Sequence, residues 1–101
     1  MAQFDVYANP NPKSRERVPY LLDIQAEILE SLTSRLVVPL VYASKPIKIL
    51  NPAFEIEGKA VVMSTQEMAG VPLGALGKKI GSLANRRSEI LGAVDFLVTG
   101  F

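Results

Sequence analysis

The chain has 101 residues, of which 49% are hydrophobic, and its 11 basic and 10 acidic residues give a formal net charge of +1. This length predicts one domain over residues 1–101, and the near-neutral charge argues against a protein held directly to nucleic acid by phosphate contacts. Cysteine and histidine are absent, which excludes disulfides, a thiol nucleophile and the commonest zinc ligands, so we expect no metal and no cofactor.

The N-terminal residues lack both a positive region and an apolar stretch, so we expect no signal peptide. The longest apolar runs, such as Leu36–Val41, are too short to cross a bilayer. These features predict a cytoplasmic protein with no membrane contact. The high apolar share predicts a partner over part of the surface, most simply a second copy in a homodimer, although an overfilled monomer core is the alternative.

The first elements follow from alternation and turn chemistry. Polar and apolar residues alternate over Gln3–Tyr7, which predicts a half-buried strand. Two Asn-Pro pairs and a charged stretch follow, so residues 8–18 are expected to form an exposed hairpin loop.

The segment 20–36 allows two interpretations. Its large apolar residues recur at spacings of three and four, which favours an amphipathic helix; they are Leu21, Ile24, Ile28, Leu32 and Leu36. However, the residues directly after Pro19 could equally form a short strand.

The middle of the chain is predicted to form β-strands. Arg35–Val41 is rich in β-branched residues, and Pro39 indicates a bulge or a strand edge there. Phe54–Glu57 and Ala60–Ser64 flank a turn at Gly58-Lys59, which predicts a hairpin. A further short strand is expected at Val71–Leu73.

The last element is the clearest. An apolar stripe predicts a helix over residues 83–98, with Ser82 as its N-terminal cap and Gly100 at the left-handed position after its end. Strands followed by one strong helix predict an α+β, mainly β, fold or a small-barrel arrangement, with one amphipathic C-terminal helix.

Few side chains suggest chemistry. Lys78-Lys79 and Arg86-Arg87 are expected to be solvated, as are the carboxylates of Asp23, Glu27 and Glu30, which have no base or nucleophile at a telling spacing. The chain stops at Thr99-Gly100-Phe101, directly after the helix. The residues alone leave open whether the terminal phenylalanine folds back or is offered to a partner.

Taken in order, several segments resemble the CcdB family of toxin–antitoxin toxins, and the resemblance runs along nearly the whole chain. They are Gln3-Phe4 with Val6-Tyr7, Leu22–Gln25 with Glu27–Leu29, Arg35–Leu40, Met68 with Val71-Pro72, and Glu89-Ile90 through Phe96 to Gly100-Phe101.

The resemblance implies an SH3-like small barrel, shared with MazF- and Kid-type toxins, and a symmetric homodimer. It makes Tyr20–Gln25 a strand and places Ile28-Leu29 in the following loop, against the helical periodicity. It implies a gyrase poison that binds the gyrase A subunit and traps the cleaved DNA complex, that is not an enzyme, and that reaches DNA only through gyrase. It also implies neutralisation by a CcdA-like antitoxin. The alternative on the same fold is a MazF-like endoribonuclease.

By the same resemblance, the gyrase-binding residues are Thr99, Gly100 and Phe101, supported by Asp95, Val98, Ile28 and Leu29. The best-known family member ends in Trp-Gly-Ile, so Thr99 replaces an aromatic residue here. That loss could cost about 2 kcal/mol of binding free energy if the aromatic residue were a hot spot, and Phe101 could compensate.

Overall fold

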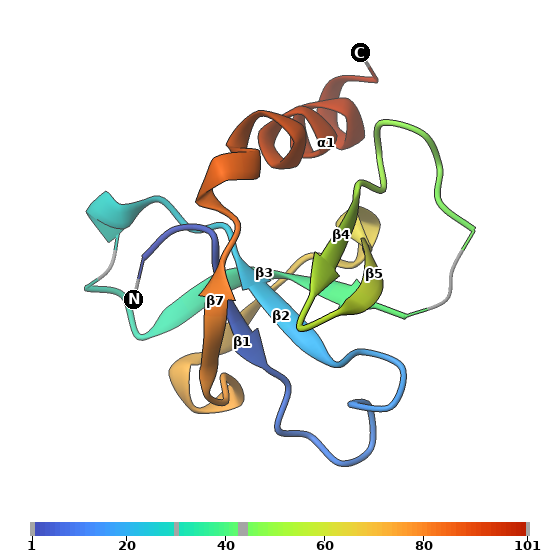
Figure 1. The fold of residues 1–101 in the computed structure, drawn as a ribbon. Coiled ribbons are helices and arrows are strands. Elements are labelled where there is room, and N and C mark those ends of the chain that lie inside the picture. Colours follow the sequence, from blue (N-terminus) through green and yellow to red (C-terminus); the bar gives the residue numbers. More distant parts are fainter. Residues whose placement is uncertain (1, 30, 43–44, 101) are drawn as a thin grey trace.

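The computed structural model describes residues 2–29, 31–42 and 45–100 (Figure 1). Its elements, in chain order, are β1 (Asp5–Ala8), β2 (Tyr20–Asp23), η1 (Glu27–Leu29), β3 (Ser34–Val41), β4 (Ala53–Ile56), β5 (Lys59–Met63), η2 (Thr65–Glu67), β6 (Ala69–Pro72), η3 (Leu73–Ala75), β7 (Lys79–Ser82), η4 (Ala84–Arg86) and α1 (Arg87–Thr99).

The strands form one curled antiparallel sheet in the order β4-β5-β3-β2-β1-β7, with β6 also paired to β3. α1 lies across one face of this sheet, as Figure 1 shows. This half-barrel with one C-terminal helix confirms the predicted small-barrel fold.

The segment 20–36 is not the helix that its periodicity favours. It consists of β2, the single turn of η1 and the start of β3. The physical reason is that β2 is buried on both faces, and a strand covered on both sides shows no polar alternation. The alternative strand at residues 20–25 is therefore the better one, although β2 ends at Asp23.

Pro39 lies in the middle of β3, opposite Leu21 of β2. On the other edge of β3, β6 pairs with residues 34–37 and β5 pairs with residues 40–41. The carbonyl of Pro39 accepts the N–H of Ser64 at 2.9 Å in the gap between these two partners. Pro39 has no N–H to donate, and it lies at the one position between the residues that pair with β6 and those that pair with β5. This explains why the sequence indicates a strand edge there.

The hairpin β4–β5 is present, with its turn one residue earlier than predicted. Glu57 and Gly58 both have positive φ, 52° and 76°, and positive φ at both central residues is the mark of a type I′ turn. Tyr20 donates from its hydroxyl to Glu57 Oε1 at 2.7 Å and so ties this turn to β2. Burial and this hydrogen bond together raise the pKa of Tyr20 well above its ordinary value.

The C-terminal helix begins later than predicted. Residues 84–86 form the separate turn η4, whose N-cap is Leu83, and the N-cap of α1 is Arg86. Ser82 is therefore not the cap of α1, although its Oγ accepts the N–H of Ala84 at 3.1 Å. Arg86 and Arg87 lie over the rings of Phe54 and Phe4, at 4.8 and 5.6 Å from their centroids. The two arginines therefore anchor the helix start, and are not merely solvated as predicted.

Two apolar clusters lie on opposite faces of the sheet. The larger one joins alternate residues of β1, β2 and β3 to α1 through the fully buried Ile90 and Ala93. The smaller one lies on the other face and contains Val18, Leu21, Val37 and Val41. The small cluster is covered by the loop 9–18 and by the segment after β6, which shape the groove described below.

Candidate functional site

The end of α1 is solvent-exposed and closely defined. Val98 exposes 76% of its surface, and Thr99 Oγ1 donates to the carbonyl of Asp95 at 2.7 Å. Gly100 has φ 79°, and its N–H donates to the carbonyl of Phe96 at 2.9 Å. The predicted left-handed glycine after the helix is thus confirmed. Phe101 lies outside the described residues.

The second set of predicted site residues lies on η1. Ile28 and Leu29 expose 88% and 45% of their surface. The Gln25 side chain fixes this turn, because its Nε2 donates to the carbonyl of Leu29 at 2.9 Å and its Oε1 accepts the N–H of Leu36 at 3.0 Å. The exposed aliphatic side chains are therefore presented from a braced backbone.

Within one chain, the structure does not bring these two sets together. Figure 1 shows η1 beside the start of the chain, at the side of the sheet. The C-terminal end of α1 lies at the far end of the helix, away from η1. Any single surface that uses both sets needs either a large partner or a second copy of the chain.

A buried ion pair that was not predicted from the sequence lies on the face of the sheet away from α1. Arg35 Nε donates to Asp23 Oδ2 at 2.8 Å and its Nη2 lies 2.7 Å from the same oxygen. The side chains are 1% and 0% exposed, so the prediction of a solvated Asp23 is wrong. Glu27 is exposed as predicted, and Glu30 lies outside the described residues. An acidic residue between Leu22 and Ile24 was the available signal, since charges in an apolar strand are rarely buried without a partner.

This pair has polar neighbours on β1. The hydroxyl of Tyr7 donates to Asp5 Oδ2 at 3.4 Å, and Lys79 Nζ lies 3.4 Å from the same oxygen. Burial, followed by the negative charges of Asp5 and Asp23, raises the pKa of Tyr7 to about 12. Lys79 belongs to strand β7, although a solvated loop was predicted at this position.

Arg35 cannot serve a bound ligand in this arrangement. Within the described part of the chain, Nη1 has no hydrogen-bond partner, Nη2 has only its 2.7 Å ion-pair contact with Asp23, and both atoms are shielded from solvent. A phosphate or substrate has no path to a guanidinium that is 1% exposed. The pair is therefore a structural element of the sheet. Residues 2–29, 31–42 and 45–100 also contain no cluster of three acidic, histidine or cysteine residues that could hold a metal ion.

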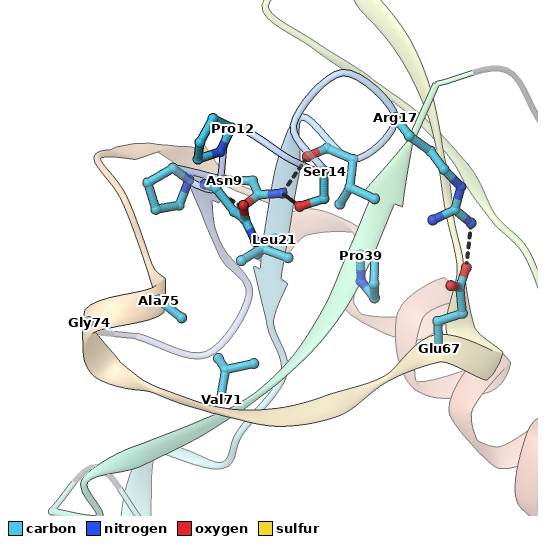
Figure 2. Close-up of a pocket in the computed structure, with 13 residues that line it drawn as sticks. Asn9, Pro12, Ser14, Arg17, Leu21, Pro39, Glu67, Val71, Gly74 and Ala75 are labelled. Atoms are coloured by element: carbon cyan, nitrogen blue, oxygen red, sulfur yellow. Dashed lines mark hydrogen bonds and ion pairs between the residues drawn. The ribbon is translucent and has the colours of Figure 1, made fainter.

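A groove of about 580 Å³ opens on the same face of the sheet (Figure 2). One wall is the loop from Asn9 to Val18, the other is the segment from Val71 to Ala75, and Leu21 and Pro39 form the floor between them. An ion pair between Arg17 and Glu67, 2.8 Å long, closes one end. The predicted exposed loop 8–18 is thus only partly exposed, because Asn9 and Val18 at its two ends are buried.

A second, smaller hollow of about 300 Å³ lies beside α1, between Ile49 and Pro52 on one side and Gly92 on the other. Ile49 has φ 74° and exposes 58% of its surface, although a β-branched residue rarely adopts this conformation. Asn51 holds the loop by accepting the N–H of Ile47 at 2.9 Å.

Comparison with known proteins places these features in context. Residues 3–100 match the model of a family described as CcdB protein. The fold is also similar to three solved toxin structures. A structure described as an Mtb toxin shares 18% identity, with 88% of this chain and 94% of that chain covered and a TM-score of 0.72.

The toxin MazF-mt6 of Mycobacterium tuberculosis shares 18% identity, with 90% and 92% covered and a TM-score of 0.74. An endoribonuclease in complex with its cognate antitoxin, from mycobacterial species, shares 12% identity, with 97% and 94% covered and a TM-score of 0.75. At these identities the three structures show a shared fold. In the described part of the chain, no helix is long and apolar enough to cross a membrane.

Proposed function

The chain belongs to the CcdB family of toxin–antitoxin toxins, and on that premise we propose that it poisons DNA gyrase. It binds the gyrase A subunit after the DNA is cut and prevents the break from being resealed. In this proposal it acts as a binding protein and not as an enzyme, and it meets DNA only through gyrase.

The exposed end of α1 carries this proposal. Val98 is 76% exposed, and the left-handed turn at Gly100 ends the helix beyond it. Val98, Thr99 and Gly100 therefore stand at the exposed end of α1. A partner that buries Phe101 there gains about 1.5–3 kcal/mol of binding free energy, which offsets the aromatic residue absent at Thr99.

Ile28 and Leu29 supply the second contact, and a homodimer would unite the two. In a two-fold pair each surface occurs twice, so η1 of one protomer can lie beside the C-terminal end of α1 in its partner. Three further large aliphatic residues near η1 are exposed and would be covered in this dimer; they are Leu32, Leu36 and Leu73.

The proposal includes a CcdA-like antitoxin that neutralises the toxin. An antitoxin segment that is disordered alone and folds on binding gives a contact that can be regulated and competed away. Membership of the CcdB family supports such a partner.

A gyrase assay tests the function directly. Purified protein is incubated with gyrase, ATP and supercoiled plasmid, and in parallel with RNA. We expect linear DNA after the complex is denatured with detergent and protease, and intact RNA. Degraded RNA with intact plasmid would instead support the endoribonuclease alternative and overturn the gyrase proposal.

Deletion of Thr99, Gly100 and Phe101 tests the site. We expect loss of gyrase binding with an unchanged melting temperature and dimer mass, because Ile90 and Ala93, which hold α1 to the sheet, remain. Val98→Asp should have the same effect, and Ala60→Asp, at an exposed position of β5, is the matched control. If the shortened chain unfolds or becomes monomeric, these three residues are needed for folding or dimerisation, and their assignment to the gyrase-binding site is wrong.

A further inference from the structure

The turn η1 is not held in place by its own packing. None of its residues, Glu27–Leu29, is buried, and Ile28 exposes 88% of its surface. The N–H of Leu29 donates to the carbonyl of Ala26 at 3.0 Å, but a single turn closed in this way is not stable alone. Contacts from outside the turn must therefore set its conformation.

Gln25 supplies such a contact at the point where the chain leaves the sheet. The N–H of Ile24 donates to the carbonyl of Leu36 at 3.0 Å, so β2 and β3 remain paired one residue beyond the end of β2. The N–H of Leu36, however, donates to Gln25 Oε1 at 3.0 Å. The carbonyl of Ile24 instead accepts Gln3 Nε2 at 3.1 Å. The side chain of Gln25 thus takes the place of the backbone at the end of this ladder.

The other end of the same amide holds η1. Gln25 Nε2 donates to the carbonyl of Leu29 at 2.9 Å, so one side chain bridges β3 and the turn. Gln25 is only 8% exposed, and burial strengthens both hydrogen bonds. Ionised glutamate has no donor and methionine has neither a donor nor a strong acceptor. The bridge therefore depends on the glutamine amide.

The buried ion pair fixes Gln25 in turn. Asp23 Oδ1 accepts the N–H of Gln25 at 2.9 Å, while Oδ2 of the same carboxylate accepts Arg35 Nε at 2.8 Å. Arg35 lies on β3, directly before Leu36. Both ends of this chain of side chains therefore return to one strand, which makes β3 the support of η1.

We propose that Gln25 is a positioning residue for partner binding at η1. Because it is buried, it acts through the turn: it holds Ile28 and Leu29 in one conformation, and the Asp23–Arg35 pair holds Gln25. A turn that is ordered before binding spares the complex the cost of ordering it. The inference rests on the proposed function for the identity of the partner, the gyrase A subunit.

The affinity of the full-length chain for the purified gyrase A subunit tests this role. Gln25→Met removes both hydrogen bonds at similar size and should weaken binding by roughly tenfold, because the turn must then be ordered on binding. The matched control is Asn9→Leu. Asn9 is also 8% exposed and holds the loop 9–18 through hydrogen bonds to Ser14 and Val18. The control should change the affinity by less than about twofold, and equal effects of the two variants overturn the proposal.

A double-mutant cycle separates positioning from general stability. Ile28→Ala with Leu29→Ala removes the side chains that Gln25 is proposed to present. In that background Gln25→Met should weaken binding further by less than about twofold, because nothing is left to position. A further loss as large as in the unaltered chain overturns the proposal. Loss of the dimer in Gln25→Met, measured by light scattering, also overturns it, because η1 would then act in dimerisation.

A second variant and a second measurement cover the case in which Gln25→Met does not fold. Gln25→Asn keeps the amide but is one methylene shorter, so it cannot reach both Leu29 and Leu36, and the same roughly tenfold loss of affinity is expected. Without any partner, hydrogen exchange of the Leu36 amide should become at least roughly tenfold faster in this variant. An unchanged exchange rate overturns the bridge. If the unaltered chain does not bind gyrase A, the proposed function is refuted, while faster exchange still establishes the bridge.

Discussion

The two faces of the sheet bury different kinds of side chain. The face under α1 is hydrocarbon: Val38, Leu40 and Ile90 meet there with no exposure at all. The opposite face buries the Asp23–Arg35 pair beside a much smaller apolar cluster. Apolar packing is non-directional, whereas a buried ion pair is favourable only in one geometry. The difference suggests that the first face supplies stability and the second fixes the positions of the loops around the groove.

The largest expected effect comes from breaking the ion pair. Asp23→Ala leaves the Arg35 guanidinium buried without its carboxylate and should lower the free energy of unfolding by about 3–5 kcal/mol, measured by urea denaturation. The double variant Asp23→Leu with Arg35→Met removes both charges and should recover most of this loss. A cost of less than about 1 kcal/mol for Asp23→Ala would show that the pair does not constrain this face.

A cavity under α1 is the matched test of the other face. Ile90→Ala removes a fully buried side chain and should cost about 3 kcal/mol in the same denaturation experiment. Here Ile90→Val should restore most of the stability, because only volume is lacking. If the valine variant were as unstable as the alanine variant, packing on this face would be as directional as on the other.

High pH should weaken the polar face selectively. The pKa of Tyr7 is raised to about 12, so the folded state favours the neutral phenol. The resulting stability is complete below about pH 10, the ordinary tyrosine value, and is lost as the pH rises from there toward 12. With 1.36 kcal/mol per pKa unit, the loss is at most about 2.7 kcal/mol. Tyr7→Phe should flatten this part of the stability profile, and an unchanged slope would contradict the assignment.

The smallest effect is expected at the wall of the groove. Gly77→Ala brings a methyl group against the Ala8 carbonyl and should cost about 1–2 kcal/mol through local displacement. Gly74→Ala, where an added Cβ meets nothing within 4 Å, is the control and should leave the melting temperature nearly unchanged. Similar melting temperatures for the two variants would mean that this wall is not pressed against β1.

The parts of the fold that the sequence predicts are those with a local signature. The terminal helix, the β4–β5 hairpin and Gly100 each depend on residues close together in the chain. The helix favoured for residues 20–36 fails because Leu21 and Ile24 belong to apolar clusters on opposite faces of the sheet, whereas Ile28, Leu32 and Leu36 are exposed. Resemblance to a family corrected that error, which periodicity alone could not.

The functional residues, too, fall into those that could be predicted from the sequence and those that could not. The residues at the end of α1 follow from the resemblance, and the structure shows that Thr99 and Gly100 are exposed. The sequence signals only that Asp23 needs a partner if it is buried. It identifies neither Arg35 as that partner nor the groove, because each needs segments that only the sheet brings together. Arg35 and Asp23 are 12 residues apart, and the groove joins the loop 9–18 to the segment after β6.

Pro39 has a further consequence for how the chain finds its alignment. One proline divides the outer edge of β3 into two short lengths, one taken by β5 and one by β6. A strand that slid along β3 past this point would meet a residue without an N–H to offer and lose a hydrogen bond. The proline therefore acts as a stop between neighbouring strands and limits slippage of either one during folding.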